Sequence, residues 1–351
     1  MGIFDALCRL AGAFLISVSP FDRLIFYGIL LTAVSLIFRI VYGVYCRIHF
    51  AESKYAFMFD KSLFREMFGF AGWSFLTNTA WIFNTQGVSM LVNVYFGVVV
   101  NAARSVAAQV EGAVMQFVNN FTVAFNPQIT KSYASDDKER MFYLINKGSR
   151  FSFFLFLFFA IPVYFEADFI LSLWLKVVPE NAVSFVRLSL IALIPNLIGN
   201  TGYVACMATG NIRKYTVLLT TIACTSFFIT WIAFYSGLAP QSTYVIFAVV
   251  YAFVEVARLI MMKQLLNFQI MTFVKDVIAK CTIVLALACI VPFFVTHCLE
   301  QSWYRLIITV ISGFLSSAAI MYFIGMSYGE RNTLKTALVS RIRSHKFQNH
   351  F

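Results

Sequence analysis

Ten long apolar runs alternate along the chain with short polar connections. A helix needs about 20 apolar residues to cross the hydrocarbon core of a bilayer. The pattern therefore predicts an all-α, polytopic membrane protein with about ten transmembrane helices. The predicted spans are 2–18, 22–46, 67–97, 100–126, 149–175, 183–207, 213–236, 241–266, 278–297 and 303–325.

Several features should make these spans irregular. The third and fourth are longer than a straight crossing requires, so we expect them to tilt, bend or extend beyond the bilayer. Pro127 is predicted to end the fourth span, and Pro162 and Pro195 lie inside spans, where proline favours kinks. Residues 268–277 are predicted to form an interfacial stretch before the ninth span.

Composition supports the membrane assignment. The chain is 60% hydrophobic and 12% charged. This is too little charge for the surface of a soluble enzyme or for a disordered protein. The net charge of +11 does not require nucleic acid, because cytoplasmic loops of membrane proteins are rich in Lys and Arg. Alternate connections hold 19 Lys and Arg residues on one side and 4 on the other. Both termini are therefore expected in the cytoplasm.

No catalytic motif or metal-ligand spacing occurs in the sequence. The seven cysteines lie mostly in apolar runs without a CxxC pair, and the four histidines lie at span ends or in the tail. We therefore expect neither an enzyme nor a metal site, and no cofactor.

Polar residues concentrate on the third and fourth spans. The third carries Asn78, Asn84 and Gln86. The fourth carries Gln109, Gln116 and Asn120 and, in addition, five polar residues that form a stripe along one side of the helix. That stripe falls within an arc of about 80° on a helix. Such a stripe must face protein or a water-filled cavity. The stripe could form a structural seam of polar contacts between helices, or it could line a hydrated cavity. The number of polar groups favours the hydrated cavity. The stripe residues are Asn101, Arg104, Glu111, Asn119 and Asn126.

The eighth span carries a second stripe, within an arc of about 60°. It consists of Tyr244, Tyr251, Glu255 and Arg258. Glu255 and Arg258 are spaced to form an ion pair, and Arg258 could instead extend to the membrane interface. An interfacial ion pair and a cavity lining therefore both remain open. Glu166 and Asp168 are expected in an interfacial cluster near the end of the fifth span.

Several segments, taken in their order, resemble one known family. They are FAGWSFL (70–76), NTQG (84–87), VNAARSVAAQV (100–110), FNPQITKSYAS (125–135), LWL (173–175), VPENAVSFVRL (178–188) and ATGNIRKY (208–215). The chain is similar to the polysaccharide or O-antigen flippases of lipopolysaccharide biosynthesis, within the multidrug/oligosaccharidyl-lipid/polysaccharide (MOP) exporter superfamily. The resemblance extends over about residues 1–325.

The resemblance implies a division of the chain into lobes. Relative to the family pattern, about four N-terminal helices are missing. The implied parts are the last two helices of an N-lobe (1–46), a cytoplasmic connector (47–66), a six-helix C-lobe (67–267), two extra helices with the interfacial segment (268–325) and a basic cytoplasmic tail (326–351).

The resemblance also implies an activity, which is flipping an undecaprenyl-pyrophosphate-linked oligosaccharide to the periplasmic leaflet of a bacterial inner membrane by alternating access. Na⁺ or H⁺ coupling, membrane lipids and other polysaccharide assembly proteins are implied partners. Arg104 or Arg258 would hold the diphosphate, and Glu111 would balance Arg104 or bind a coupling cation. The sugars would meet the amides of Asn78, Asn84, Gln86, Asn119 and Asn126.

Three alternatives remain open. A drug or cation antiporter of the same superfamily would need an acidic cavity, whereas Glu111 and Glu255 each lie within reach of an arginine. A membrane enzyme acting on glycans would need a large loop or an intramembrane histidine, and neither is seen in the sequence. A non-functional fragment of a flippase is the third, because of the missing helices.

Overall fold

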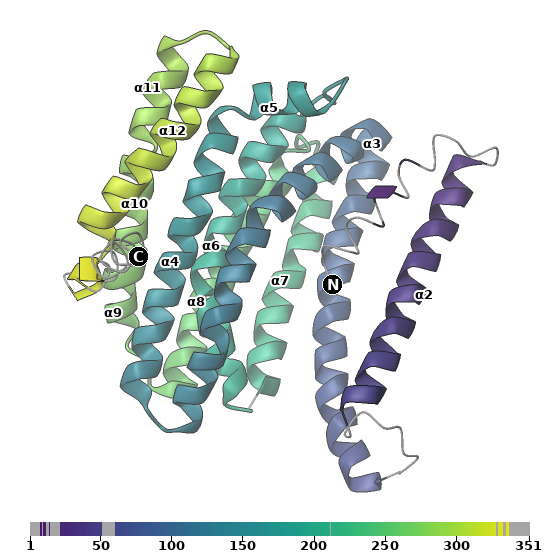
Figure 1. The fold of residues 1–351 in the computed structure, drawn as a ribbon, viewed down its shortest axis with the longest axis vertical. Coiled ribbons are helices and arrows are strands. Elements are labelled where there is room, and N and C mark those ends of the chain that lie inside the picture. The colour runs from purple at the N-terminus through teal and green to yellow at the C-terminus, as the bar shows by residue number, and fades with distance from the viewer. Residues whose placement is uncertain are drawn as a thin grey trace, which may run out of the picture. The chain divides into compact units, whose positions relative to one another are not determined.

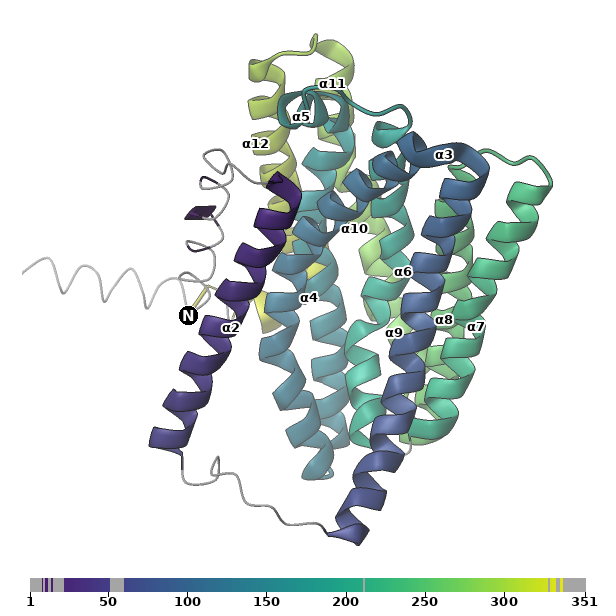
Figure 2. The same cartoon turned by 90° about the vertical axis from the view of Figure 1, so that its right-hand side faces the viewer.

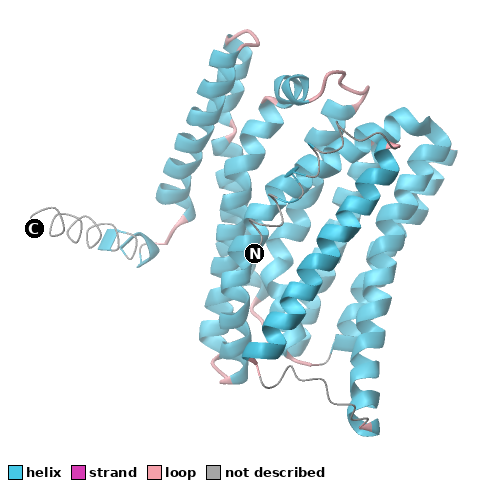
Figure 3. Ribbon diagram, turned by 45° about the vertical axis from the view of Figure 1, so that its right-hand side comes forward, coloured by secondary structure: helices cyan, strands magenta, loops and turns pink. Residues whose placement is uncertain are grey.

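The computed structural model describes residues 8, 10–11, 14, 22–50, 60–210, 212–327, 329–332 and 335–336. Within these ranges every regular element is a helix and no strand occurs (Figure 3). Eight of the described helical stretches are long and apolar enough to cross a membrane. The chain is therefore an all-helical, multi-pass membrane protein, as the hydrophobic pattern predicts. The first predicted span, 2–18, lies almost wholly outside the described residues.

The chain divides into two compact units, Met1–Phe68 and Gly69–Phe351. The first contains α2, an apolar helix in which Val34 is buried and most of the described side chains are exposed. The second contains all the other helices except the first turns of α3. The helices are α2 (Arg23–His49), α3 (Lys61–Ala134), α4 (Lys138–Phe165), α5 (Ala167–Trp174), α6 (Ala182–Ala208), α7 (Ile212–Tyr235), α8 (Ser242–Leu266), α9 (Ile270–Phe273), α10 (Lys280–Ala288), α11 (Ile290–Cys298) and α12 (Trp303–Ile320), with π-helical turns η2 (Val274–Ala279) and η3 (Met321–Gly325).

Helix α3 doubles back on itself (Figure 2). Gly97 has φ 84° and ψ 176°, which interrupts the helix. On either side of it, the Ser89 hydroxyl donates to Asn101 Oδ1 at 3.0 Å, and Arg104 Nη2 donates to the Thr85 carbonyl at 3.4 Å. These contacts require that the helix on either side of Gly97 forms two antiparallel arms. Within the second unit, the first arm is 69–96 and the second arm is 98–134. The two arms match the predicted third and fourth spans.

The prediction that Pro127 ends the fourth span is wrong, because α3 continues to Ala134. Proline removes the backbone donor that would bond to the Val123 carbonyl, so the helix continues with one hydrogen bond fewer. Beyond the proline, Ile129 and Ser132 are buried. Burial of the turn that follows Pro127 therefore stabilises the helix beyond this proline.

The boundaries of two other predicted spans also change. Helix α4 begins at Lys138 rather than at 149, because Asp137 caps it by accepting the Arg140 N–H at 3.0 Å. It ends at Phe165, so the predicted span 149–175 covers two helices, α4 and α5. The stretch 268–277 is mostly helical and continuous with the ninth span, which extends over Ile270–Cys298. Pro162 lies inside α4 and Pro195 inside α6, as predicted.

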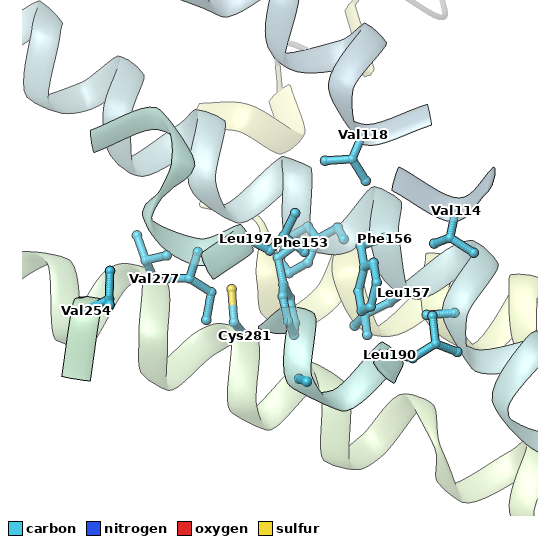
Figure 4. Packing of buried hydrophobic residues seen from close by; sticks show 14 of the residues in the cluster. Val114, Val118, Phe153, Phe156, Leu157, Leu190, Leu197, Val254, Val277 and Cys281 are labelled. Carbon is cyan, nitrogen blue, oxygen red and sulfur yellow. The ribbon is translucent and has the colours of Figure 1, made fainter. Parts of the chain in front are cut away.

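The core of the second unit is built around α6, which packs against α8 on one side and α4 on the other. Two glycines of α6 permit this approach. A Cβ at Gly199 would overlap the Glu255 and Arg258 side chains, and one at Gly202 would lie 2.6 Å from the Met262 sulfur. Apolar side chains from α3, α4, α6, α8 and the α9–α10 stretch fill the space between the helices (Figure 4). Small residues thus allow close helix packing where lipid offers no hydrophobic driving force.

Helix α12 is held against α4 at two points. The Glu166 carboxylate, fully buried, accepts three hydrogen bonds from Arg305, and its Oε1 also accepts from the Thr309 hydroxyl at 2.8 Å. Beyond η3, Glu330 forms a buried ion pair with Arg150 of α4. The last membrane-crossing helix is therefore joined to the core by charged contacts near both of its ends.

We expect Gly97→Ala to destabilise the α3 hairpin by about 1–3 kcal/mol, because its backbone conformation is essentially confined to glycine. No heavy atom lies within 4 Å of the added Cβ, so the cost is one of backbone strain alone. The measurement is thermal unfolding of the purified protein in detergent.

The matched control is Gly112→Ala, in the helical interior of the second arm, where a Cβ also meets nothing within 4 Å. This change should be neutral or stabilising by up to about 1 kcal/mol. Equal stability of both variants would contradict a strained turn at Gly97.

Candidate functional site

Polar residues of α3 and α8 form a first group beside the α3 hairpin. Asn101 and Arg104 use their side chains to join the two arms of α3. Arg104 also interacts electrostatically with Glu111 and with Tyr244 of α8. No ion pair within 4 Å joins Arg104 to Glu111 in the described part of the chain. Their seven-residue spacing explains this, because it separates them by about 10 Å along the helix. The Nε atom of Arg104 is buried without a hydrogen-bond partner.

A second group surrounds a cavity of about 260 Å³ between the first arm of α3 and helices α6, α7 and α8. This volume is below the range of about 300–1,000 Å³ typical of sites for small molecules. The cavity can therefore hold water or a small ion but not an oligosaccharide. Its polar lining consists of Asn78, Asn84, Asn196, Tyr203, Tyr215, Thr216, Thr220, Tyr251 and Arg258.

Asn84 joins α3 to α7 and is buried. Its Nδ2 atom donates to the Ala223 carbonyl at 3.3 Å, and its Oδ1 atom accepts from the Ser226 hydroxyl at 2.8 Å. Both ends of the amide are thus committed to a neighbouring helix. At Asn84 the structure favours a polar seam between helices over a contact with substrate.

Arg258 and Glu255 form the predicted ion pair, with 2.9 Å between Nη1 and Oε2. Arg258 Nη2 also donates to Asn196 Oδ1 at 3.3 Å. Because Arg258 is only 6% exposed, the alternative in which it extends to the membrane interface is wrong. Glu255 Oε1 and Arg258 Nε are buried without a hydrogen-bond partner in the described residues. Water in the adjoining cavity could satisfy such atoms.

Three predicted site residues, Gln86, Asn119 and Asn126, do not join either group. Gln86 and Asn119 are exposed, and Asn126 is half-buried with its Oδ1 atom unpartnered. Tyr251 lines the cavity and interacts electrostatically with Glu111, so it lies between the two groups. The structure therefore brings together part of the predicted set and leaves the rest on the surface of α3.

The exposed side of the second arm of α3 has an unusual composition. Between residues 98 and 134, only Val98, Val99, Phe117 and Val123 are exposed large apolar side chains, and the first two adjoin the turn. The shorter helix α8 exposes five such side chains. We call the four exposed amides between residues 109 and 120 the polar face. They are Gln109, Gln116, Asn119 and Asn120.

Sequence reasoning missed three partnerships. Asn196 is the partner of Arg258, and the only sequence feature that could have indicated this was the presence of an amide inside an apolar span. Arg150 was assigned to a connection, yet it lies buried inside α4 and pairs with Glu330. Glu166, expected in a cluster near the end of the fifth span, is fully buried against Arg305. Its partners lie 139 and 143 residues away, so local sequence could not identify them.

Comparisons with protein-family models, curated proteins and solved structures found no match. The family resemblance thus stays a prediction. Among the described residues, no three His, Cys, Asp or Glu side chains are grouped so as to hold a metal ion. The site is accordingly characterised by its polar network alone.

We expect Arg258→Gln to destabilise the protein by about 3–5 kcal/mol, because it leaves the Glu255 carboxylate buried without its counter-ion. Combining it with Glu255→Gln should cost less than the sum of the two single changes. Unfolding in detergent of the two single variants and the double variant measures this coupling.

Lys280→Gln is the control, because it breaks a partly exposed ion pair of 3.1 Å with Asp276. It should cost less than about 1 kcal/mol. Strict additivity of the Glu255 and Arg258 changes would show that the two side chains do not stabilise each other.

Proposed function

We propose that the protein is a transporter that flips an undecaprenyl-pyrophosphate-linked oligosaccharide from the cytoplasmic to the periplasmic leaflet of a bacterial inner membrane. Transport would occur by alternating access and serve the export of a surface polysaccharide such as O-antigen. The proposal joins the sequence resemblance to one structural observation, the polar face of α3.

The polar face supports transport because it lies in the second arm of the candidate membrane-crossing stretch Asn78–Ala134. Hydrocarbon offers no hydrogen bonds to side-chain amides, so lipid cannot cover this face without a large cost. Water, or another polar surface, must border it. Amides both donate and accept hydrogen bonds, which suits the hydroxyl groups of sugars. A hydrated path along the second arm of α3 is the arrangement that a glycan head needs.

Charge near the polar face suits a diphosphate. Arg104 lies on the same arm and is half-buried, with an unpartnered Nε atom. Arg258, by contrast, is committed to Glu255 and Asn196 beside a cavity too small for an oligosaccharide. We therefore assign the diphosphate to Arg104. Glu111, half-buried and without an ion pair in the described residues, is our candidate for balancing Arg104 or binding a coupling cation.

Orientation is part of the proposal. The structure removes Arg150 from the predicted cytoplasmic connections, because its side chain is buried against other helices. The asymmetry of basic residues then becomes 18 against 4, which still favours cytoplasmic termini.

A structural role for the polar face is the competing interpretation. Ala108 and Gly112 are exposed on the same side of the second arm and are four residues apart. This small-residue spacing favours direct packing of another helix. In that case the amides would be bonded across a helix interface rather than hydrated.

We expect the double change Gln116→Leu and Asn119→Leu to slow glycan export about tenfold or more, since hydrogen bonds to the sugars are lost. Membrane levels of the protein should stay normal, because both side chains are exposed. Each variant is expressed in cells from which the gene has been deleted and which therefore lack surface glycan. Export is measured as the amount of glycan restored to the cell surface.

Gln128→Leu provides the control, since Gln128 is exposed on the same arm but lies outside the polar face, about 120° around the helix from Gln116. This variant should export normally. Normal export by the double variant, at normal protein levels, would refute a glycan path along the polar face.

A further inference from the structure

A wide cleft lies between α4, α6 and the α10–α11 stretch. Its volume is about 800 Å³, within the range of ligand sites. Its walls are apolar and include Leu157 of α4, Leu190 of α6 and Phe293 of α11. Four polar lining side chains belong to α5, to the first turns of α6 and α12 and to the α11–α12 connection. These are Asp168, Arg187, Gln301 and Arg305. Figure 1 shows α5 and the α11–α12 connection at the same end of the helices.

Two of these polar residues keep unused hydrogen-bonding atoms. Arg187 Nη2 pairs with Asp168 Oδ2 at 2.7 Å, and Arg187 Nε donates to the Tyr164 carbonyl at 3.0 Å. Within the described residues, Arg187 Nη1 and Asp168 Oδ1 have no partner. The two side chains are 36% and 48% exposed, so a ligand can reach both.

The other two polar residues differ from each other. Arg305 is occupied, because its nitrogens donate to Glu166 and to the Leu299 carbonyl. It is therefore a fixed part of the wall. Gln301 is exposed, and its amide has no partner in the part of the chain that is described. The accessible polar end thus offers one guanidinium, one carboxylate and one amide, with no net charge.

We propose that this cleft binds a phospholipid whose headgroup carries both a phosphate and a primary ammonium, as phosphatidylethanolamine does. The acyl chain lies along the apolar walls, which face hydrocarbon in a membrane-crossing bundle. The phosphate accepts hydrogen bonds from Arg187 Nη1 and the Gln301 amide. The ammonium donates to Asp168 Oδ1.

Charge complementarity selects this headgroup. An anionic headgroup without an amine would place its charge beside the Asp168 carboxylate and leave it unpaired. A choline headgroup carries a cation but no N–H that could donate to Asp168. The cleft shares no lining residue with the 260 Å³ cavity and includes none of the polar face. The proposal therefore does not depend on the transported substrate.

The test is lipid binding to the purified full chain in detergent, followed by native mass spectrometry. Phosphatidylethanolamine, phosphatidylglycerol and phosphatidylcholine with identical acyl chains are titrated separately. We expect phosphatidylethanolamine to bind about tenfold more tightly than the other two. Arg187→Gln should weaken binding of all three, and Asp168→Asn should remove the preference for phosphatidylethanolamine.

Lys176→Gln and Glu180→Gln are matched controls, because each removes one charge from an exposed residue in the α5–α6 connection that does not line the cleft. They should leave binding unchanged. Equal binding of the three lipids to the unaltered protein, or equal losses in controls and cleft variants, would overturn the proposal.

A second variant tests the cleft without altering its charges. Ile191→Trp places a larger side chain at a lining position that is exposed and should displace the lipid while leaving the core intact. Ile260→Trp, on the exposed apolar side of α8, is its control. Retention of phosphatidylethanolamine by Ile191→Trp at wild-type affinity would overturn the proposal.

Discussion

Hydrocarbon cannot satisfy a hydrogen bond, and this constraint governs where every polar side chain of the protein can lie. Asn84 bonds to α7, Glu255 and Arg258 bond to each other, and Glu166 bonds to Arg305 and Thr309. Each of these groups is buried between helices. The four amides of the polar face of α3 differ from these groups, because they are exposed. The polar face is therefore the strongest indication of function.

Charged contacts also determine how the later helices join the core. Glu166–Arg305 and Arg150–Glu330 bind the α12 region to α4 near both ends of the helix. Replacing one partner of a buried pair leaves an uncompensated charge, so such contacts are costly to break. The 800 Å³ cleft lies beside this junction, and Arg305 lines it. The same contacts that fix α12 therefore help shape the proposed lipid site.

The helices were predicted well from the sequence wherever the length of an apolar run is enough to specify a membrane-crossing helix. The sequence also separated the two arms of α3 close to Gly97, where the predicted third span ends. It failed where distant contacts decide. Burial of Ile129 keeps α3 helical beyond Pro127, and Glu330, 180 residues along the chain, buries Arg150. Of the candidate site, the ion pair of Glu255 and Arg258 followed from helical spacing. The commitment of Asn84 to α7 did not, because it depends on packing.

The most direct test of the account is whether water reaches the polar face. Asn119→Cys and, for comparison, Val256→Cys on the exposed apolar side of α8 would be placed in a variant lacking the native cysteines. Permeabilised membranes would then be treated with a charged maleimide, which reacts with the thiolate that forms in water. The account predicts labelling of Asn119→Cys and none of Val256→Cys. Failure of Asn119→Cys to react would contradict a hydrated path along α3.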